Sequence, residues 1–193
     1  MAAFELPAGI RLASHDDLGP VRRMLDDAFE ELRSKRYGAE IAARELALLA
    51  DGGASGFAGI PAGSKGRTWI ATGCSTRGPA AGTASVGTVG PAVGAAAAHV
   101  EQLSGGEPWG ALDLVYVVPA ARRSGTGTAL LRAATDWLAS LGCHGVDCLV
   151  LPGDRPGKSF LENAGLKARV IVMHTSLATC GRELARSEPV QEP

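Results

Sequence analysis

The sequence predicts a single mixed α/β domain, in which strands and helices share one layered core. Its 193 residues fit one domain and are enough to bury a sizeable core. Hydrophobic residues make up 46% of the chain and charged residues 20%, which is typical of a soluble globular protein. Strand-like and helical periodicities then follow one another in the order β-α-α-β, a long loop, and β-β-α-β-α-β.

The N-terminal elements begin with residues 9–14 (GIRLAS), whose alternation predicts a short strand. Ser14 is a candidate helix N-cap, with Asp17 three residues later. A helix to about Arg33 is predicted by apolar residues at helical spacing: Leu18, Val21, Met24, Leu25, Phe29 and Leu32. The strong helix formers of residues 39–50 predict a second helix.

Glycine-rich segments separate the elements in the middle of the chain. Residues 51–66 are such a connection, and residues 67–73 (RTWIATG) predict a strand. Residues 74–94 contain many breakers and little periodicity, so we expect a long loop, either mobile or functional, in which an irregular strand is an alternative for part of the segment. The alanine-rich residues 95–103 are compatible with a helix or a strand, and we favour the strand.

The C-terminal half gives sharper signals. Residues 111–119 (ALDLVYVVP) predict a β-rich, apolar strand that Pro119 stops. A helix begins at Thr126, carries one apolar face and ends at Gly142.

The last elements are predicted to be a buried strand over residues 145–151, a short helix over 156–165 and a final strand over 166–177. We expect these elements to belong to one domain that covers residues 1–180. Residues 181–193 are polar and predict a frayed tail.

Composition excludes several functional classes. The formal net charge is −1, whereas proteins that bind nucleic acid through its phosphates normally carry a basic excess, so we expect no nucleic-acid partner. No basic segment followed by an apolar run opens the chain, and no apolar stretch is long enough to span a bilayer. We therefore expect a cytoplasmic protein without a membrane partner.

The four cysteines form no CxxC pair. Cys143, His144 and Cys148 resemble a metal cluster, but a structural zinc site needs two closely spaced ligand pairs and a second pair is missing. We expect no metal, and free thiols fit a reducing cytosol.

A glycine loop before the predicted helix at Thr126 indicates a phosphate-binding site. A P-loop would need a lysine after its glycines, and a dinucleotide fingerprint would need a third glycine where Leu130 stands. A third design, a strand and proline followed by R-x-x-G-x-G and a helix, fits the sequence. Glycines let backbone N–H groups and the helix dipole approach an anion, and arginines add charged donors. The predicted pyrophosphate site comprises Arg122, Arg123, Ser124, Gly125, Thr126, Gly127 and Thr128.

Residues 114–131 (LVYVVPAARRSGTGTALL) resemble the acetyl-CoA loop of the GNAT acyltransferase superfamily, Q/R-x-x-G-x-G/A after a strand ending in V-x-P. Residues 154–166 (DRPGKSFLENAGL) resemble its second signature, roughly N-x-x-A-x-x-F-Y-x-x-x-G-F, with Phe160 and Gly165 in place. The resemblance covers about residues 111–172. It implies a GNAT-like fold, with a central, mostly antiparallel sheet flanked by helices.

The resemblance also implies the activity: direct transfer of an acetyl group from acetyl-CoA, the co-substrate, to a primary amine of a small molecule or peptide. It implies that the backbone of Val117 and Val118 pairs with the pantetheine arm and polarises the thioester carbonyl. Asp154 stands where the family often has an asparagine near this arm. Phe160 packs either beside the arm or in the core. A homodimer is a possible assembly, and the sequence does not identify the amine.

Asp113 is the candidate base, because an ammonium group must lose a proton before it attacks. It is the one acid in its strand, four residues before Val117, where many family members place a glutamate. Alternation is expected to put Asp113, Val115 and Val117 on one face. Asp113 could instead be a strand-end residue satisfied by a neighbouring backbone group or arginine. Weaker candidates for the base are Glu101, Glu107 and His99.

The sequence differs from the family at the position of the general acid, the residue that protonates the leaving thiolate. Leu161 occupies the position of the family's tyrosine, so no proton donor stands there. Tyr116 is the alternative, although alternation is expected to point it away from Asp113. Tyr37, near the expected substrate loop, is a more distant candidate. The departure leaves a second hypothesis, a GNAT-like domain that binds acyl-CoA as a sensor or partner and has weak or no transferase activity. Two interpretations are open for the acidic residues of the first helix, a face toward a cationic substrate or a solvated face, and we favour the solvated face: Asp26, Asp27, Glu30 and Glu31.

Overall fold

A computed structural model describes residues 6–35, 38–40, 43, 66–73, 90–102, 106–151 and 153–169. The chain forms two compact units, Met1–Lys158 and Ser159–Pro193. The predicted domain end near residue 180 lies outside the described residues, and the single domain over 1–180 stays a prediction.

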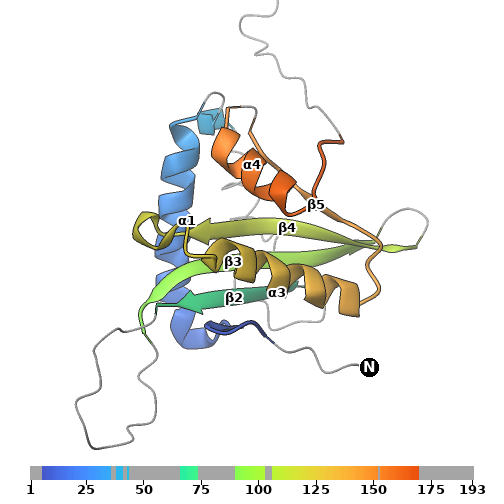
Figure 1. Cartoon of the computed structure of the whole chain (residues 1–193), viewed down its shortest axis with the longest axis horizontal. Helices are drawn as coiled ribbons and strands as arrows, with labels where there is room; N and C mark the ends of the chain where they lie inside the picture. The colour runs from blue at the N-terminus through green and yellow to red at the C-terminus, as the bar shows by residue number, and fades with distance from the viewer. Residues whose placement is uncertain are drawn as a thin grey trace, which may run out of the picture. The chain divides into compact units, whose positions relative to one another are not determined.

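The first unit is built on a five-stranded sheet (Figure 1). Its strands lie in the order of the sequence: β1 (Ile10–Leu12), β2 (Gly66–Thr72), β3 (Ala92–Gln102), β4 (Pro108–Val117) and β5 (Val146–Cys148). The first four are antiparallel to their neighbours, and β5 runs parallel to β4. The predicted mixed, mostly antiparallel sheet is confirmed.

Two helices cover opposite faces of this sheet. Ile70, Ala95 and Tyr116 form one row across three strands and pack against α1 (Leu18–Arg33). The next row along β2, at Trp69, faces the other way, and the Trp69 ring lies edge-on to Trp137 of α3 (Thr126–Ser140), 5.5 Å between centroids. Figure 1 shows α3 crossing the face of β3 and β2. The sheet is thus apolar on both faces and buried between the helices.

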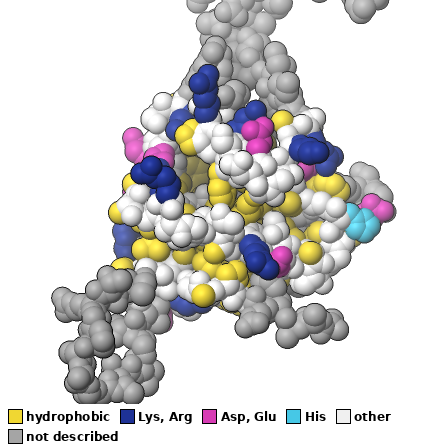
Figure 2. All heavy atoms as spheres, in the orientation of Figure 1, with side chains coloured by type: hydrophobic (Ala, Val, Ile, Leu, Met, Phe, Trp, Pro, Cys, Tyr) yellow, Lys and Arg dark blue, Asp and Glu magenta, His cyan; other side chains and the backbone are white. Residues whose placement is uncertain are grey.

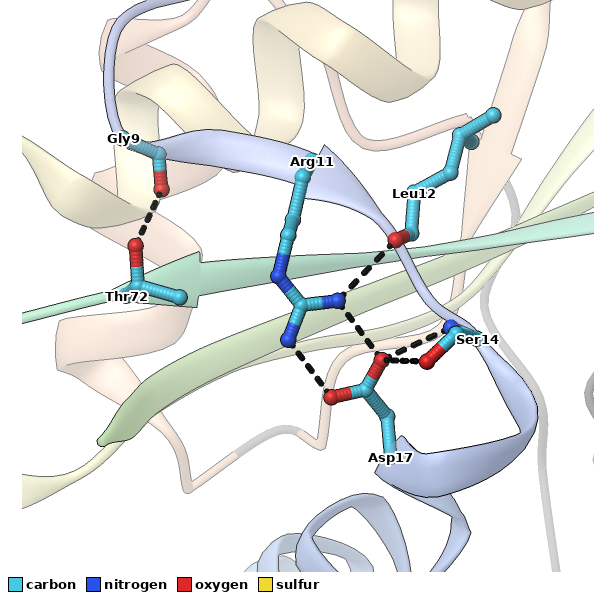
Figure 3. Close-up of polar contacts among 6 residues, drawn as sticks. All are labelled: Gly9, Arg11, Leu12, Ser14, Asp17 and Thr72. Atoms are coloured by element: carbon cyan, nitrogen blue, oxygen red, sulfur yellow. Dashed lines mark hydrogen bonds and ion pairs between the residues drawn. The ribbon is translucent and has the colours of Figure 1, made fainter. Parts of the chain in front are cut away.

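The start of α1 is fixed by a charged cluster (Figure 3). Arg11 of β1 donates from Nη1 and Nη2 to the two carboxylate oxygens of Asp17, each at 2.6 Å. The backbone N–H and the hydroxyl of Ser14 donate to Asp17 Oδ2 at 2.7 and 2.9 Å. The predicted Ser14–Asp17 pair therefore caps a short 3₁₀ turn, His15–Asp17, directly before α1.

The helix α4 (Arg155–Asn163) begins in the first unit and ends in the second. Pro156 lies in its first turn and Gly165 follows it with φ +94°, as the sequence predicted. Leu166–Arg169 belong to no strand, and the rest of the predicted strand 166–177 lies outside the described residues. The predicted second helix is described only at residues 38–40 and 43, which are helical.

Several boundaries differ from the predictions, and β4, for example, begins at Pro108 and not at residue 111. The strand β3 begins at Ala92, inside the segment 74–94 that we expected to be a loop, because its ladder with β2 and β4 outweighs the local Gly-Ala composition. The predicted buried strand over 145–151 is wrong beyond Cys148, since Leu149 is 79% exposed. An apolar run does not reveal which of its residues another element covers.

The described helices include none that is both long and apolar enough to cross a membrane. On the face shown in Figure 2, Lys and Arg side chains are interspersed with Asp and Glu and do not gather in one basic patch. This agrees with 19 basic and 20 acidic residues in the chain.

Candidate functional site

The sheet opens between β4 and β5. The two strands pair only at Gly110, Ala111 and Leu112 of β4, as far as the described residues reach. From Leu114 to Val117, β4 keeps its ladder with β3 on one edge, while β5 no longer pairs with the other edge in the described part of the chain. An uncovered edge presents main-chain N–H and C=O groups to which an extended ligand can pair.

The directions of the β4 main-chain groups follow from one hydrogen bond. Val118 N–H donates to Val93 O at 2.9 Å, so Val118 directs its N–H toward β3. In an antiparallel strand, two successive residues point their N–H and C=O groups to opposite edges. Val117 therefore faces the open edge, and its C=O accepts a hydrogen bond from Arg122 Nε at 2.9 Å. Of the two residues predicted to pair with the pantetheine arm, Val117 is the one whose N–H faces the opening.

Two residues in the loop after β4 have a left-handed backbone conformation. A 3₁₀ turn, Pro119–Ala121, is followed by Arg123 with φ +62° and Gly125 with φ +85°. Ser124 Oγ donates to Ala121 O and shares a hydrogen bond with Thr126 Oγ1, both at 2.7 Å. Turns of this kind point successive N–H groups into one concavity that suits an anion.

The loop leads directly into α3, with Gly125 as the N-cap. The first helical bond is made by Ala129 N–H, which donates to Gly125 O at 3.0 Å. The N–H groups of Thr126, Gly127 and Thr128 consequently have no acceptor within the helix. Together with the helix dipole, such free N–H groups suit an anion, and the pyrophosphate site at this helix start stays a prediction.

The two loop arginines have different surroundings. Arg122 Nη2 donates to Glu31 Oε1 of α1 at 2.6 Å, and its guanidinium lies 5.5 Å from the centroid of the Tyr116 ring. Arg123 is exposed and makes no side-chain hydrogen bond or ion pair with any described residue. The charge of Arg122 is thus partly neutralised, whereas that of Arg123 is available to an anion at the helix start.

Tyr116 is buried, and its hydroxyl donates to Glu31 Oε1 at 3.1 Å. Burial, followed by the hydrogen bond to the Glu31 carboxylate, raises the pKa of Tyr116 above its ordinary value. A phenol in these surroundings holds its proton more tightly than a free tyrosine, which weakens it as a general acid.

Asp113 lies at an irregularity of β4. The β3–β4 register passes from Ala97↔Leu114 to Ala98↔Leu112 and skips Asp113, as in a β-bulge. Asp113 Oδ2 lies 2.8 Å from His99 Nδ1, and His99 Nε2 lies 3.2 Å from Glu101 Oε1. The partner of the Asp113 side chain is therefore a histidine of β3, and not the backbone group or arginine that was considered from the sequence.

The bulge corrects the predicted side-chain directions. His99 alternates with Ala95 on β3, so it shares the α1-facing side of the sheet with Tyr116. Asp113, which contacts His99, lies on this side as well, whereas Val115 pairs with Ala96 on the side of α3. The expectation that Asp113 shares a face with Val115 and Val117 and points away from Tyr116 is wrong, because the skipped residue shifts the alternation.

Asp113 acts on the pKa of two neighbouring side chains, His99 and Cys148. The hydrogen bond that His99 donates to the Asp113 carboxylate is the main cause that raises the pKa of His99, and Glu101 adds to it. Burial, together with the charge of Asp113, raises the pKa of the Cys148 thiol to about 11. Cys148 therefore remains a thiol at neutral pH and is a poor nucleophile. No group of three or more potential ligands for a metal ion occurs in the described part of the chain.

The remaining predicted residues lie on α4 or next to it. Asp154 directly precedes α4, and its Oδ1 lies 3.5 Å from Lys35 Nζ, beyond the end of α1. Phe160 is partly buried and Leu161 is buried, and both belong to the second unit. Their roles beside the pantetheine arm stay predictions.

The sequence analysis missed three contacts, two of Glu31 and one of His99. Glu31 was expected on a solvated helix face, but it joins Tyr116 and Arg122, which lie 85 and 91 residues away. His99 was a weaker candidate for the base, and its pairing with Asp113 was not foreseen. For the His99–Asp113 pair, the available signal was a polar residue in each of two largely apolar strands that follow one another.

Comparison with known proteins agrees with this geometry. Residues 22–166, more than half of the chain, match the model of the acetyltransferase (GNAT) family. None of the curated proteins matches the sequence significantly.

Many solved structures share the fold. An acetyltransferase of Trypanosoma brucei is 21% identical, with a TM-score of 0.54 over 87% of this chain and 98% of that chain. A tetramutant protein of Bacillus halodurans is 15% identical, with a TM-score of 0.62 over 87% and 99%. AAC(6')-Iy, in complex with the bisubstrate analogue CoA-S-monomethyl-acetylneamine, is 19% identical, with a TM-score of 0.54 over 86% and 97%. At these identities the similarity concerns the fold.

Proposed function

The chain belongs to the GNAT acetyltransferase family, and on this premise we propose that it transfers an acetyl group from acetyl-CoA to a primary amine by direct attack. The observation that carries the proposal is the continuity of the open β4 edge with the anion-binding start of α3. A CoA molecule needs both features: a strand edge for its amide-containing arm and a cationic, N–H-rich turn for its pyrophosphate.

The described residues fit the donor. Val117 presents its N–H to the open edge, Arg123 brings an unpaired cation, and the first turn of α3 supplies N–H groups without helical acceptors. In the proposed complex the Val117 N–H is the donor nearest the thioester, where it would stabilise the developing oxyanion. Arg122 would give up its bond to the Val117 carbonyl wherever the pantetheine arm pairs there.

Asp113 is the proposed base. The ammonium form of the acceptor passes one proton to the Asp113 carboxylate, and the neutral amine attacks the thioester carbonyl carbon. The C–N bond forms and the C–S bond breaks, so that CoA leaves as a thiolate. The second proton of the attacking nitrogen reaches the sulfur through solvent, and Asp113 returns its proton to solvent.

The leaving group does not depend on a strong acid. Leu161 has no proton to donate, and the Tyr116 hydroxyl is bound to Glu31. A thiol has an ordinary pKa of about 8.5, so its thiolate leaves without full protonation in the transition state. A transfer that is slower than in relatives with a tyrosine donor is the expected consequence.

Leu161 and Tyr116, neither of which is a good proton donor, favour a second candidate function: an acyl-CoA-binding domain with little or no transferase activity. A thiol-release assay with acetyl-CoA and a panel of small amines, polyamines and peptide N-termini separates the two candidates. The proposal expects CoA release that depends on one class of amine. Tight acetyl-CoA binding without release on any amine would favour the binding domain.

A further inference from the structure

The Asp113–His99–Glu101 cluster carries an inference that rests on the proposed function. His99 is almost buried, with 9% of its side chain exposed, while the side chains of Asp113 and Glu101 are 15% and 50% exposed. Both ring nitrogens of His99 face carboxylates, so both are placed to donate a hydrogen bond, as in the imidazolium form.

The contact with His99 uses only one of the two oxygens of the Asp113 carboxylate. Oδ2 accepts the bond from His99 Nδ1, which leaves Oδ1 for another partner. Asp113 is exposed when all its atoms are counted, but only 15% of its side chain is exposed. The accessible surface of Asp113 therefore lies mainly on its main chain, at the bulge. Asp113 therefore lies at the point where β4 leaves β5, with one oxygen already fixed.

We propose that His99 is a positioning residue, which holds Asp113 through Oδ2 and thereby directs Oδ1 to the acceptor amine. Glu101 anchors the opposite side of the imidazole ring at the solvent end of the cluster. A carboxylate held by one donor has fewer rotamers to populate, and a misplacement of about 1 Å can cost a reaction on the order of 100-fold in rate.

The ionisable neighbours of His99 are consistent with this role. Asp113 of β4 and Glu101 of β3 are the charged groups that act on His99, and both stabilise its protonated form. On β5, Cys148 faces Asp113 and stays a neutral thiol. On β2, Arg67 lies over the Trp137 ring on the side of α3, away from the cluster.

Steady-state kinetics of the full chain tests the inference. The variants are His99→Leu, His99→Asn, His99→Gln and Asp113→Asn. His99→Leu removes the donor and should lower kcat by about 10- to 100-fold with an unchanged KM for acetyl-CoA. The amide of His99→Asn can reach the position of Nδ1 and should restore most of kcat, whereas that of His99→Gln reaches toward Nε2 and should not. These two polar variants decide the question even if His99→Leu does not fold.

The double variant separates positioning from stability. If His99 acts through Asp113, then His99→Leu should cost nothing further in an Asp113→Asn background. His144→Leu, at an exposed histidine near Glu107, is the matched control and should leave kcat unchanged. A folded His99→Leu variant with full kcat, or equal losses in both backgrounds, would overturn the inference and leave the proposed function intact. A wild-type protein that binds acetyl-CoA but acylates no amine would overturn both.

Discussion

Arg122 of the loop before α3 and Glu31 of α1 form an ion pair, with Nη2 and Oε1 2.6 Å apart. The same carboxylate oxygen accepts the Tyr116 hydroxyl at 3.1 Å. The contact connects the N-terminal helix, the central strand and the anion-binding loop. Because both partners are more than 40% exposed, it contributes only about 0.2–1 kcal/mol to stability, but it places a negative charge beside the proposed pyrophosphate site.

Glu31→Gln should therefore tighten the binding of acetyl-CoA. The substitution releases the full charge of Arg122 to the anion, and the expected gain in affinity is about 2- to 5-fold at low salt. Isothermal titration of acetyl-CoA measures it. Glu30→Gln is the control, because Glu30 pairs with Arg33 at 2.9 Å and should leave Kd unchanged. Weaker binding by Glu31→Gln would mean that Glu31 instead holds Arg122 in its binding position.

Gly125→Val should abolish measurable acetyl-CoA binding. Gly125 has φ +85°, and a Cβ placed there meets nothing within 4 Å, so the new side chain would project into the space needed by the anion. Gly142→Val is a matched control at the other end of α3, with φ +80° and an equally open position. Both variants should lose about 1–2 kcal/mol of stability from backbone strain, but only Gly125→Val should lose binding. Equal Kd values for the two variants would show that the site lies elsewhere.

Asp113→Asn should lower the rate of transfer most at neutral pH. A general base contributes about 10²- to 10⁴-fold, and the loss should shrink as the acceptor amine deprotonates by itself at high pH. The pH profile of kcat/KM is the measurement. Asp136→Asn, at an exposed carboxylate 3.5 Å from Arg132, controls for the loss of charge. A loss that does not change with pH would argue against Asp113 as the base.

Asp17 should make folding sensitive to acid. Its bonds with Arg11, and then with Ser14, hold the pKa of the Asp17 carboxyl well below its usual range. The folded pKa lies below the unfolded value of about 3.9, so the stabilisation is complete above that value and is lost as the pH falls toward the folded pKa. Asp17→Asn should cost about 1–3 kcal/mol in urea unfolding at pH 7 and progressively less below about pH 4.

Asp16→Asn is the control for this experiment, because Asp16 is exposed and has no part in the Arg11 cluster. A constant difference between Asp17→Asn and wild type across this pH range would contradict the assignment.

Local signals predicted the glycine turn at the start of α3. The conformations of Gly125 and Gly142 depend on a few neighbouring residues, and the sequence shows these glycines directly. The Ser14–Asp17 cap was predictable for the same reason, although its partner Arg11 was not.

Contacts between distant elements were not predictable in this way. The bulge at Asp113 adds one residue to β4, and no residue pattern in β4 indicates a bulge. Strict alternation therefore placed the Asp113 side chain on the wrong face of the sheet. Glu31 is indistinguishable in sequence from the solvated acids around it until α1 packs on β4. Leu149 belongs to an apolar run, yet the sheet ladder ends one residue before it.

The most direct test of the central claim is to follow a labelled acetyl group from acetyl-CoA, with the purified full chain and the amine that gives the fastest thiol release. The claim predicts one amide formed for each CoA released, in wild type but not in Gly125→Val. CoA release without amide formation, or no release with any amine, would contradict it.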